Sequence, residues 1–389
     1  MENLETPFDA DKQLIIAEVR RFVDREVIPV AHQLEHDDNY PIELIEKLKQ
    51  LGIFSATIPE AYGGLGFDFT TYVQVVEELS RGWMSLAGIV NTHVLVAYMI
   101  AAQGTEEQRQ RFLPLLAEGD KRGGLCISEA NAGSDVQAIT MTAVRDGEDY
   151  IINGAKLWVT NGVHAGIFAV LVRTDPNAQP AHRGMSVFLV EKGTPGLTVS
   201  RTFEKLGYKG VETAELVFDA VRVPAVQLLG GSEGAGFKHA MSGLEVGRIN
   251  VAARAVGLAQ AAFNDAIRYA QQRATFGKPI AQHQAIQLKL ADMATKIEAA
   301  RLLLQKAARK KDRGERCDLE AGMAKLFASE MCQEVTLDAL RIHGGFGYTK
   351  EFNVERYYRD APFMLVGEGT SEIQRLVIAR QLLEQYKET

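Results

Sequence analysis

Cysteine is scarce in this sequence, and neither sign of charge strongly dominates. The 389 residues include three cysteines, Cys126, Cys317 and Cys332, which form no C-x-x-C pair and lie too far apart for a disulfide framework. A reducing compartment is the simplest interpretation, and we expect a cytoplasmic protein. The formal net charge of −7 lacks the clustered excess of cations that tracking a phosphate backbone needs, so we expect no nucleic-acid partner.

Targeting and membrane-spanning segments are also missing. Residues 1–20 have neither the basic start and apolar run of a signal peptide nor the Arg-rich, acid-poor composition of an organelle transit peptide. The most apolar stretch, residues 86–102, is interrupted by Asn91, Thr92 and His93 and falls short of a membrane span. We therefore expect no membrane partner.

Several nucleotide and metal motifs are absent as well. No G-x-G-x-x-G follows a strand, and the only Gly-Lys pair, Gly277-Lys278, is followed by Pro279, so there is neither a dinucleotide fingerprint nor a P-loop. His32 and His36 are four residues apart, but no third ligand is indicated. A solvated helix face explains them better than a metal site, and we expect no metal.

The chain has three textures, which suit the two or three domains expected for its length. Residues 11 to about 120 show helical spacing, for example at Ile15, Ile16, Val19 and Phe22. Residues 123 to about 225 form short β-prone runs divided by turns: 140–144 and 150–152 around Asp146-Gly147, which suits a type I′ hairpin, then 167–172, 187–190 and 214–218. Beyond residue 236 the helices return, and apolar residues from 286 to 304 step by four and three, as in a packed bundle.

Three segments are candidates for chemistry. Residues 125–135 run from a strand into a small-residue loop, residues 157–162 place Trp158 at a strand end, and residues 367–372 flank Glu368 with glycines. Each also has an ordinary structural interpretation. In that interpretation, the first segment is a capped turn and Trp158 is a core residue. Glu368 is then a carboxylate near a helix start, with Thr370 in the cap.

Taken together, these segments match the motifs of one protein family. The motifs occur in the same order as in that family and cover nearly the whole chain. The sequence resembles the acyl-CoA dehydrogenases: residues 126–138 fit the first signature of that family and residues 343–360 fit the second. Further landmarks are residues 273–277, 283–285 and 368–370. The resemblance implies an α+β fold with an N-terminal α-helical domain (1–122), a middle β-barrel-like domain (123–232) and a C-terminal four-helix bundle (233–389).

The resemblance also implies FAD as the cofactor and acyl-CoA as the substrate. Residues 125–134 would hold the flavin and Trp158 and Thr160 would flank its ring, while residues near 273, 284 and 341–345 would contact the FAD of a neighbouring subunit. The family is usually a tetramer, a dimer of dimers. The implied cofactor-binding residues are Leu125, Ile127, Ser128, Gly133, Ser134, Trp158, Thr160, Arg273, Phe276, Gln284, Arg341, Gly344, Gly345, Thr370 and Glu372. Those implied for the thioester are Ser134, Glu245, Arg248 and Gly369, although Glu245 and Arg248 could instead pair with each other at i, i+3 on a helix surface.

Glu368 is the implied catalytic base. It would remove the α-proton of the thioester while the β-hydride passes to flavin N5, and its own N–H and a flavin ribityl hydroxyl would stabilise the enolate oxygen. We expect burial among Met364, Leu365 and Val366 to raise its pKa. Another base position known in the family falls on Gly247, which cannot act.

Some positions depart from the family pattern. Arg341 stands where Gln or an acid is usual, Val211-Glu212 replaces a small pair and has no evident physical reason, and Gly367 replaces a bulky aromatic residue. A smaller residue at 367 predicts room for a branched acyl group. For the polar residues 91–93, ordinary helix contacts are favoured over contact with a polar acyl end.

A short or branched acyl-CoA is therefore the favoured substrate, as in fatty-acid or branched amino-acid breakdown, with an electron-transfer flavoprotein as electron acceptor. One alternative is an acyl-CoA oxidase or a nitroalkane-type oxidase on the same fold, although the nitroalkane relatives use Asp as base. The alternative from another class is a non-catalytic protein that binds flavin or acyl-CoA.

Overall fold

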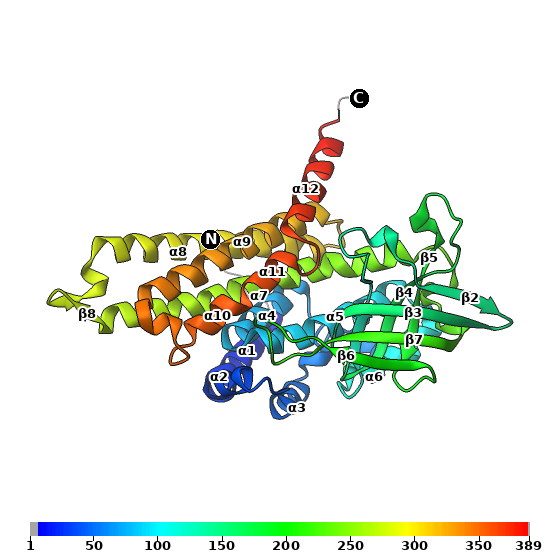
Figure 1. Ribbon diagram of the computed structural model, residues 1–389, viewed down its shortest axis with the longest axis horizontal. Helices are drawn as coiled ribbons and strands as arrows, with labels where there is room; N and C mark the ends of the chain where they lie inside the picture. Colours follow the sequence, from blue (N-terminus) through cyan, green and yellow to red (C-terminus); the bar gives the residue numbers. More distant parts are fainter. Residues whose placement is uncertain (1–6, 388–389) are drawn as a thin grey trace.

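The computed structural model describes residues 7–387, and the predicted order of helical, β and helical parts is confirmed (Figure 1). Residues 1–6, which belong to the stretch inspected for targeting signals, lie outside the described residues. The sheet forms one end of the elongated molecule and the ends of the longest helices form the other.

The N-terminal part is built from amphipathic helices and one almost wholly buried helix. Asp68 begins α4 by accepting a hydrogen bond from Thr71 N, and a capping box of Thr105 and Gln108 begins α6. The helices are α1 (Pro7–Phe22), the π-helical turn η1 (Val23–Val27), α2 (Ile28–His36), α3 (Ile42–Gln50), α4 (Phe69–Gly82), α5 (Met84–Gln103) and α6 (Glu106–Ala117).

Helix α5 corrects one sequence expectation. Asn91, Thr92 and His93 do not interrupt it, and its 20 residues are apolar enough to span a membrane by length and composition. In the structure, however, 89% of its most apolar window is buried inside the protein, where it packs against α4, α7 and β1. It is the core helix of a folded domain.

The middle part is a curled seven-stranded sheet in the order β1-β4-β2-β3-β7-β6, with β5 also paired to β4. β1 and β4 are parallel, and the pairs β2–β3, β3–β7, β4–β5 and β6–β7 are antiparallel. The strands are β1 (Arg122–Cys126), β2 (Thr142–Asp146), β3 (Asp149–Thr160), β4 (Ala165–Arg173), β5 (Met185–Glu191), β6 (Leu197–Thr202) and β7 (Thr213–Pro224).

The predicted β2–β3 hairpin is present, but its predicted turn type is wrong. Asp146 pairs with Asp149, so the two loop residues are Gly147 and Glu148. Only Gly147, at the first loop position, has a positive φ (65°), as in a type II′ turn. A type I′ turn needs positive φ at both positions, and Glu148 does not adopt it.

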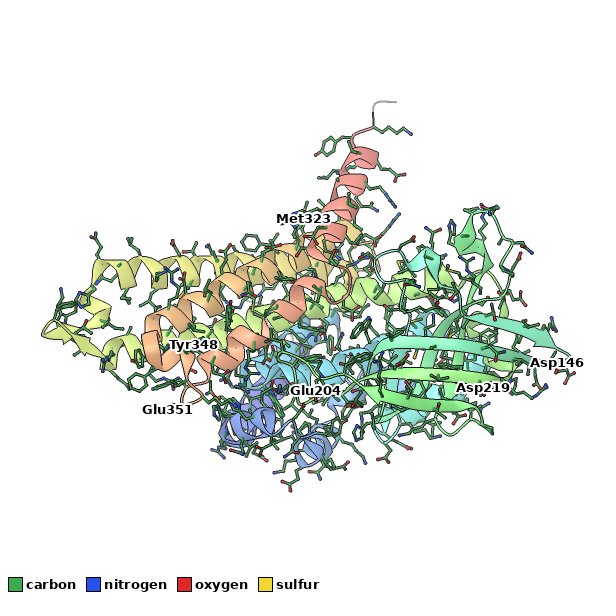
Figure 2. The ribbon with its side chains drawn as sticks, viewed as in Figure 1. Asp146, Glu204, Asp219, Met323, Tyr348 and Glu351 are labelled. Carbon is green, nitrogen blue, oxygen red and sulfur yellow. The ribbon has the colours of Figure 1, made fainter. Side chains whose placement is uncertain are left out.

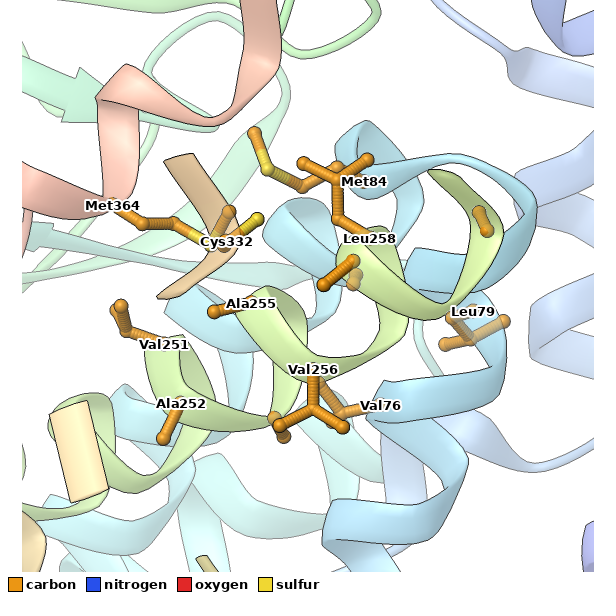
Figure 3. Packing of buried hydrophobic residues seen from close by; sticks show 14 of the residues in the cluster. Val76, Leu79, Met84, Val251, Ala252, Ala255, Val256, Leu258, Cys332 and Met364 are labelled. Carbon is orange, nitrogen blue, oxygen red and sulfur yellow. The ribbon is translucent and has the colours of Figure 1, made fainter. Parts of the chain in front are cut away.

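The C-terminal part is organised around α7 (Gly236–Gln272), whose 37 residues span about 55 Å. Its small residues allow α4, α5 and α9 to approach closely, and Figure 3 shows Val251, Ala255 and Val256 of α7 packed among residues of those helices and Met364 of α11. The other elements are β8 (Ala274–Thr275), β9 (Lys278–Pro279), α8 (Gln284–Asp312), α9 (Asp318–His343), α10 (Val354–Asp360), α11 (Pro362–Val366) and α12 (Ser371–Gln385).

The predicted bundle seam is confirmed on α8. Met293, Ile297, Ala300 and Leu304 are buried, and Ile286 and Leu290 pack against the same core. Helix α12 leaves the bundle and projects away from the rest of the molecule after its first turns (Figure 1). The loop between α11 and α12 carries Glu368.

Candidate active site

The backbone around Glu368 adopts an uncommon conformation. Helix α11 ends at Val366, Glu368 has φ 56° and Gly369 has φ 92°. A left-handed conformation at a non-glycine residue costs of the order of 1–3 kcal/mol and is concentrated at functional sites. Thr370 then begins α12 by accepting a hydrogen bond from Ile373 N at 3.3 Å, so the predicted cap is confirmed.

Two buried side chains donate hydrogen bonds to carbonyl groups of this loop. Lys325 Nζ of α9 donates to the carbonyl of Gly369 at 2.8 Å and to that of Leu365 at 3.4 Å. Gln374 Nε2 donates to the carbonyls of Glu368 and Gly369 at 3.3 and 3.1 Å. Burial lowers the pKa of Lys325 to about 8. These contacts fix the loop through its carbonyl groups and leave the N–H of Glu368 without an acceptor among residues 7–387.

The carboxyl group of Glu368 is only half satisfied. Asn91 Nδ2 of α5 donates to Oε1 at 3.2 Å, while Oε2 is buried without a hydrogen-bond partner in the described chain. Burial raises the pKa of Glu368, against the opposing effects of Arg254, Asn91, Arg248 and Lys325. The direction agrees with the prediction, but the surroundings differ from those expected: Val366 is 62% exposed, and the buried neighbours come from α5 and α7.

Gly247 of α7 faces the carboxyl directly. A Cβ atom placed on Gly247 would lie 2.5 Å from Oε2 of Glu368 and 3.2 Å from the Leu95 side chain. The other base position that the family resemblance implies is therefore adjacent to the Glu368 carboxyl. A glycine there leaves the space to Glu368.

Sequence reasoning missed the aromatic and cationic group beside Glu368. Tyr208 and Phe363 stack with ring centroids 4.5 Å apart, and Arg254 Nη1 of α7 donates to the Tyr208 hydroxyl at 3.2 Å. Tyr208 is buried at φ 58°, and burial raises its pKa to about 12, with smaller contributions that include the charge of Glu368. One sequence signal was available, since Arg254 is the lone charge in the apolar run 251–259.

The space beside Gly367 is occupied by the ring of Phe363. A Cβ atom at this position would lie 2.9 Å from Cζ of Phe363, so the Phe363 ring already occupies the space beside it. The expectation that the missing aromatic side chain simply leaves room for a branched acyl group is therefore not supported.

The residues predicted to hold the flavin lie at the end of the sheet nearer the bundle. Leu125 is in β1, Ile127 and Ser128 follow it, and Gly133 and Ser134 are exposed in the next loop. Beneath this loop, Glu129 accepts hydrogen bonds from Thr140 N (2.6 Å), Met141 N (3.1 Å) and Lys156 Nζ (2.8 Å). Burial alone would raise the pKa of Glu129, but the charge and hydrogen bond of Lys156 and the Thr140 donors outweigh it, and the pKa is lowered.

Trp158 presents an exposed ring beside this loop. It has φ 60°, is 57% exposed, and leans on Phe203 with ring centroids 4.4 Å apart, while Thr160 is half-buried at the end of β3. An exposed flat ring next to a loop of small residues suits a flavin. The structure also accounts for Glu212, whose Oε1 accepts from Val163 N and His164 N and so holds the turn that follows β3.

The second predicted set lies at the other end of the molecule. Arg273, Phe276 and Gln284 are exposed around the β8–β9 turn, and Arg341, Gly344 and Gly345 are exposed at the end of α9. Phe276 is 96% exposed at φ 51°. Figure 2 shows the distance between the two ends, with Tyr348 beside α9 and Asp146 at the tip of the sheet. Within one chain, therefore, the two sets of predicted cofactor-binding residues lie far apart.

The residues predicted for the thioester are partly engaged within the chain. Glu245 accepts from Lys311 Nζ at 2.6 Å and from Cys317 N at 3.3 Å, and Arg248 lies 3.5 Å from Asp318. The alternative that Glu245 and Arg248 pair on a solvated helix surface is wrong, because both are buried and bind other partners. Nε of Arg248 has no partner in the described chain. Gly369 lies next to Glu368, whereas Ser134 is on the β-domain loop.

Two smaller expectations change. His93 is an ordinary helix contact, bonded to the carbonyl of Phe54 and to Gly123 N, but Asn91 contacts Glu368 itself. His32 and His36 do not form a solvated face, because they contact Asn353 and Glu355. No group of three or more potential metal ligands occurs in the part of the chain that the structure describes.

Comparisons with known proteins agree with this arrangement. Models of three acyl-CoA dehydrogenase domains match: the N-terminal domain over residues 9–120, the middle domain over 124–221 and the C-terminal domain over 234–383. An acyl-CoA dehydrogenase of Bacillus subtilis is 44% identical over 94% of this chain and 96% of its own length. The mitochondrial short-chain specific acyl-CoA dehydrogenase of Bos taurus is 42% identical over 96% of this chain and 90% of its own. The solved butyryl-CoA dehydrogenase of Megasphaera elsdenii is 40% identical, with a TM-score of 0.94 over 98% of this chain and 100% of that one.

Proposed function

Because the chain belongs to the acyl-CoA dehydrogenase family of oxidoreductases, we propose that it converts a short acyl-CoA thioester to the trans-2-enoyl-CoA. The short acyl group is supported by the names of two relatives, a short-chain specific and a butyryl-CoA dehydrogenase. The observation that carries the chemistry is the Glu368 carboxyl, held in a strained loop with one oxygen bonded and the other left without a partner.

Glu368 is suited to remove the α-proton of the thioester. A general base works best when its pKa lies near the working pH, and burial moves the pKa of Glu368 in that direction. The proton would go to Oε2, since Oε1 is occupied by Asn91. The N–H of Glu368 is available to donate to the thioester oxygen, where negative charge develops as the α-proton leaves.

FAD is the cofactor implied by the family, and it would accept the hydride from the β-carbon. The residues present suit it: the exposed ring of Trp158, the loop around Gly133 and Ser134, and open space around Gly133, where an added Cβ would meet no atom within 4 Å. We propose that the exposed set at the far end of the bundle, around Arg273 and Phe276, completes the FAD site of a second subunit, in a homotetramer.

The first experiment is an anaerobic titration of the purified yellow protein with butyryl-, isobutyryl-, 2-methylbutyryl-, isovaleryl-, octanoyl- and glutaryl-CoA, following flavin absorbance. Bleaching by one of these thioesters supports the proposed reaction and identifies its acyl class. A protein that stays yellow with all of them contradicts it, and a colourless protein that FAD cannot reconstitute contradicts the cofactor assignment.

The electron acceptor separates the proposal from its alternatives. We propose that electrons pass to an electron-transfer flavoprotein, so the reduced enzyme should react slowly with O₂ and quickly with such a protein. Rapid reoxidation by O₂ would favour an oxidase on this fold. Binding of FAD and acyl-CoA without bleaching would favour a non-catalytic binding protein. The cytoplasmic location stays a prediction from the sequence.

A further inference from the structure

Arg254 is a buried cation without a counter-ion. Its side chain is 1% exposed, yet no carboxylate among residues 7–387 lies within ion-pair distance. Nη1 donates to the Tyr208 hydroxyl at 3.2 Å, and Nε has no partner. A guanidinium has five N–H donors, and a buried charge that lacks a partner is costly. The aromatic rings of Phe363 and Tyr208, at 5.3 and 5.8 Å from its Cζ atom, compensate only part of this cost.

The position of Arg254 directs this cation toward the base. Gly247 and Arg254 are seven residues apart and so share one face of α7, and helical side chains lean toward the helix N-terminus, here back toward Gly247. Of the charged groups around Glu368, Arg254 has the largest effect on its carboxyl. Phe363 links the two, since its ring lies beside Arg254 and against Gly367, the residue before the base.

A role as counter-ion to Glu368 alone does not explain the arrangement. The two side chains form no ion pair, the Glu368 carboxyl takes its hydrogen bond from Asn91, and its Oε2 remains without a partner. Each of the two buried charges therefore keeps an unused hydrogen-bonding position. The two positions suit two parts of one ligand: its α-carbon would lie at Glu368, and an anionic group at its other end would lie at Arg254.

We propose that the acyl group of the substrate ends in a carboxylate and that Arg254, assisted by the Tyr208 hydroxyl, binds it. The inference rests on the proposed function and narrows its substrate to a short dicarboxylic acyl-CoA. The guanidinium fork matches a carboxylate in a bidentate geometry that no neutral acyl end can reproduce. The carboxylate keeps its charge throughout, and the bonds made and broken are those of the dehydrogenation already described.

The test compares thioesters of equal carbon number with and without a terminal carboxylate: succinyl- against butyryl-CoA, glutaryl- against valeryl-CoA, and adipyl- against hexanoyl-CoA. Anaerobic flavin bleaching measures the rate of flavin reduction by each thioester, and calorimetry on a Glu368→Gln background measures binding without reaction. For one of the pairs, the wild-type protein should prefer the carboxylated member by roughly 10- to 100-fold, the range expected for a charge-assisted hydrogen bond.

Arg254→Met should abolish or reverse this preference, because it keeps an unbranched, flexible side chain but removes the charge and its donors, and Arg254→Lys should keep part of it. Thermal unfolding checks that both variants fold. If the wild-type protein binds and oxidises the neutral members as well as the carboxylated ones, the inference is overturned while the proposed function stands. If no thioester of either kind bleaches the flavin, the proposed function itself fails. If Arg254→Met does not fold, the wild-type preference and the Lys variant decide.

Discussion

Two glutamates whose carboxyl groups are shielded from solvent differ in the hydrogen bonds that they receive. Glu129, under the loop of the middle domain, has its carboxylate surrounded by Lys156 and the donors of Thr140 and Met141, and its pKa is lowered. Glu368, between α11 and α12, has one hydrogen bond from Asn91 and one oxygen without a partner, and its pKa is raised. The carboxylate of Glu129 has hydrogen-bond partners for both oxygens. The carboxyl of Glu368 has a raised pKa and one oxygen that can accept a hydrogen bond or a proton from a ligand.

The difference shows how one residue type serves stability in one place and chemistry in another. Burial disfavours the charge of both groups, and the balance is decided by how many donors the surrounding backbone and side chains supply. A carboxylate with complete partners is structural. A buried one with incomplete partners is a candidate base.

Replacing Glu368, the proposed base, should have the largest effect. Glu368→Gln keeps the shape of the side chain but cannot accept the α-proton, so the rate of flavin reduction should fall by about 10²- to 10⁴-fold with FAD still bound. Stopped-flow bleaching under anaerobic conditions measures it. Glu384→Gln, an exposed change on α12, is the control and should leave the rate unchanged. Normal turnover by the Glu368→Gln variant would refute the assignment.

Breaking the ion pair between Lys156 and Glu129 should lower the stability of the protein. Lys156→Met leaves Glu129 buried without its counter-ion and should lower the free energy of unfolding by about 3–5 kcal/mol. Denaturant unfolding measures the loss. The matched control is Arg222→Met, which removes exposed pairs with Asp146 and Asp149 and should cost less than about 1 kcal/mol. Equal losses in the two variants would contradict the structural role of Glu129.

Removing the single donor to the base should sharpen the contrast. Asn91→Leu takes away the hydrogen bond that favours the charged form of Glu368, so its pKa should rise further. The pH at which flavin reduction reaches half its maximal rate should then move upward, with a rate loss of roughly tenfold at pH values below the pKa of the carboxyl, the size of one hydrogen bond to a charged group. Thr92→Val, which alters the neighbouring residue, should leave the pH profile in place.

The smallest effect is a difference in pH dependence of stability. The lowered pKa of Glu129 gives a contribution that is present above its unfolded pKa and is lost as the pH falls through its folded pKa. The raised pKa of Glu368 has the opposite sign: ionising it costs stability above its folded pKa, and this cost disappears below about 4.5. Relative to wild type, Glu368→Gln should therefore gain stability as the pH rises from 4 to 8. Unfolding curves across this range measure the stability of the variant relative to wild type. A relative loss of stability with rising pH would contradict the prediction.

Much of the fold could be predicted from local patterns in the sequence. The apolar steps from 286 to 304 predicted the bundle helix, and the β-prone runs 167–172, 187–190 and 214–218 predicted β4, β5 and β7, because both patterns arise from contacts that each element makes along its whole length. Strand β6 (Leu197–Thr202) was missed, because most of its residues are exposed and show no buried alternation. The length of helix α5 was misjudged because its three polar residues lowered the apparent hydropathy. In the structure His93 bonds to Phe54 and Gly123, and the amide nitrogen of Asn91 donates to Glu368.

The site was predicted only where a short motif marks it. Glu368 and the segment 125–134 stand in recognisable stretches, but the group around Tyr208 does not. Its members, Arg254 and Phe363 among them, come from a loop, α7 and α11, and their meeting depends on how the helices pack. Single-residue signals existed, such as a lone arginine in an apolar run, yet the sequence could not show that its partners are two rings and no carboxylate.

Gly247 sets a constraint on how this enzyme can change over evolutionary time. A single methyl group there would already press against the oxygen of Glu368, so any side chain at position 247 requires the Glu368 carboxyl to move. Moving the base from one element to the other would need two substitutions, and either order passes through an intermediate that is crowded or has no base. Positions 247 and 368 are therefore coupled: a change at one alters which side chain the other can hold.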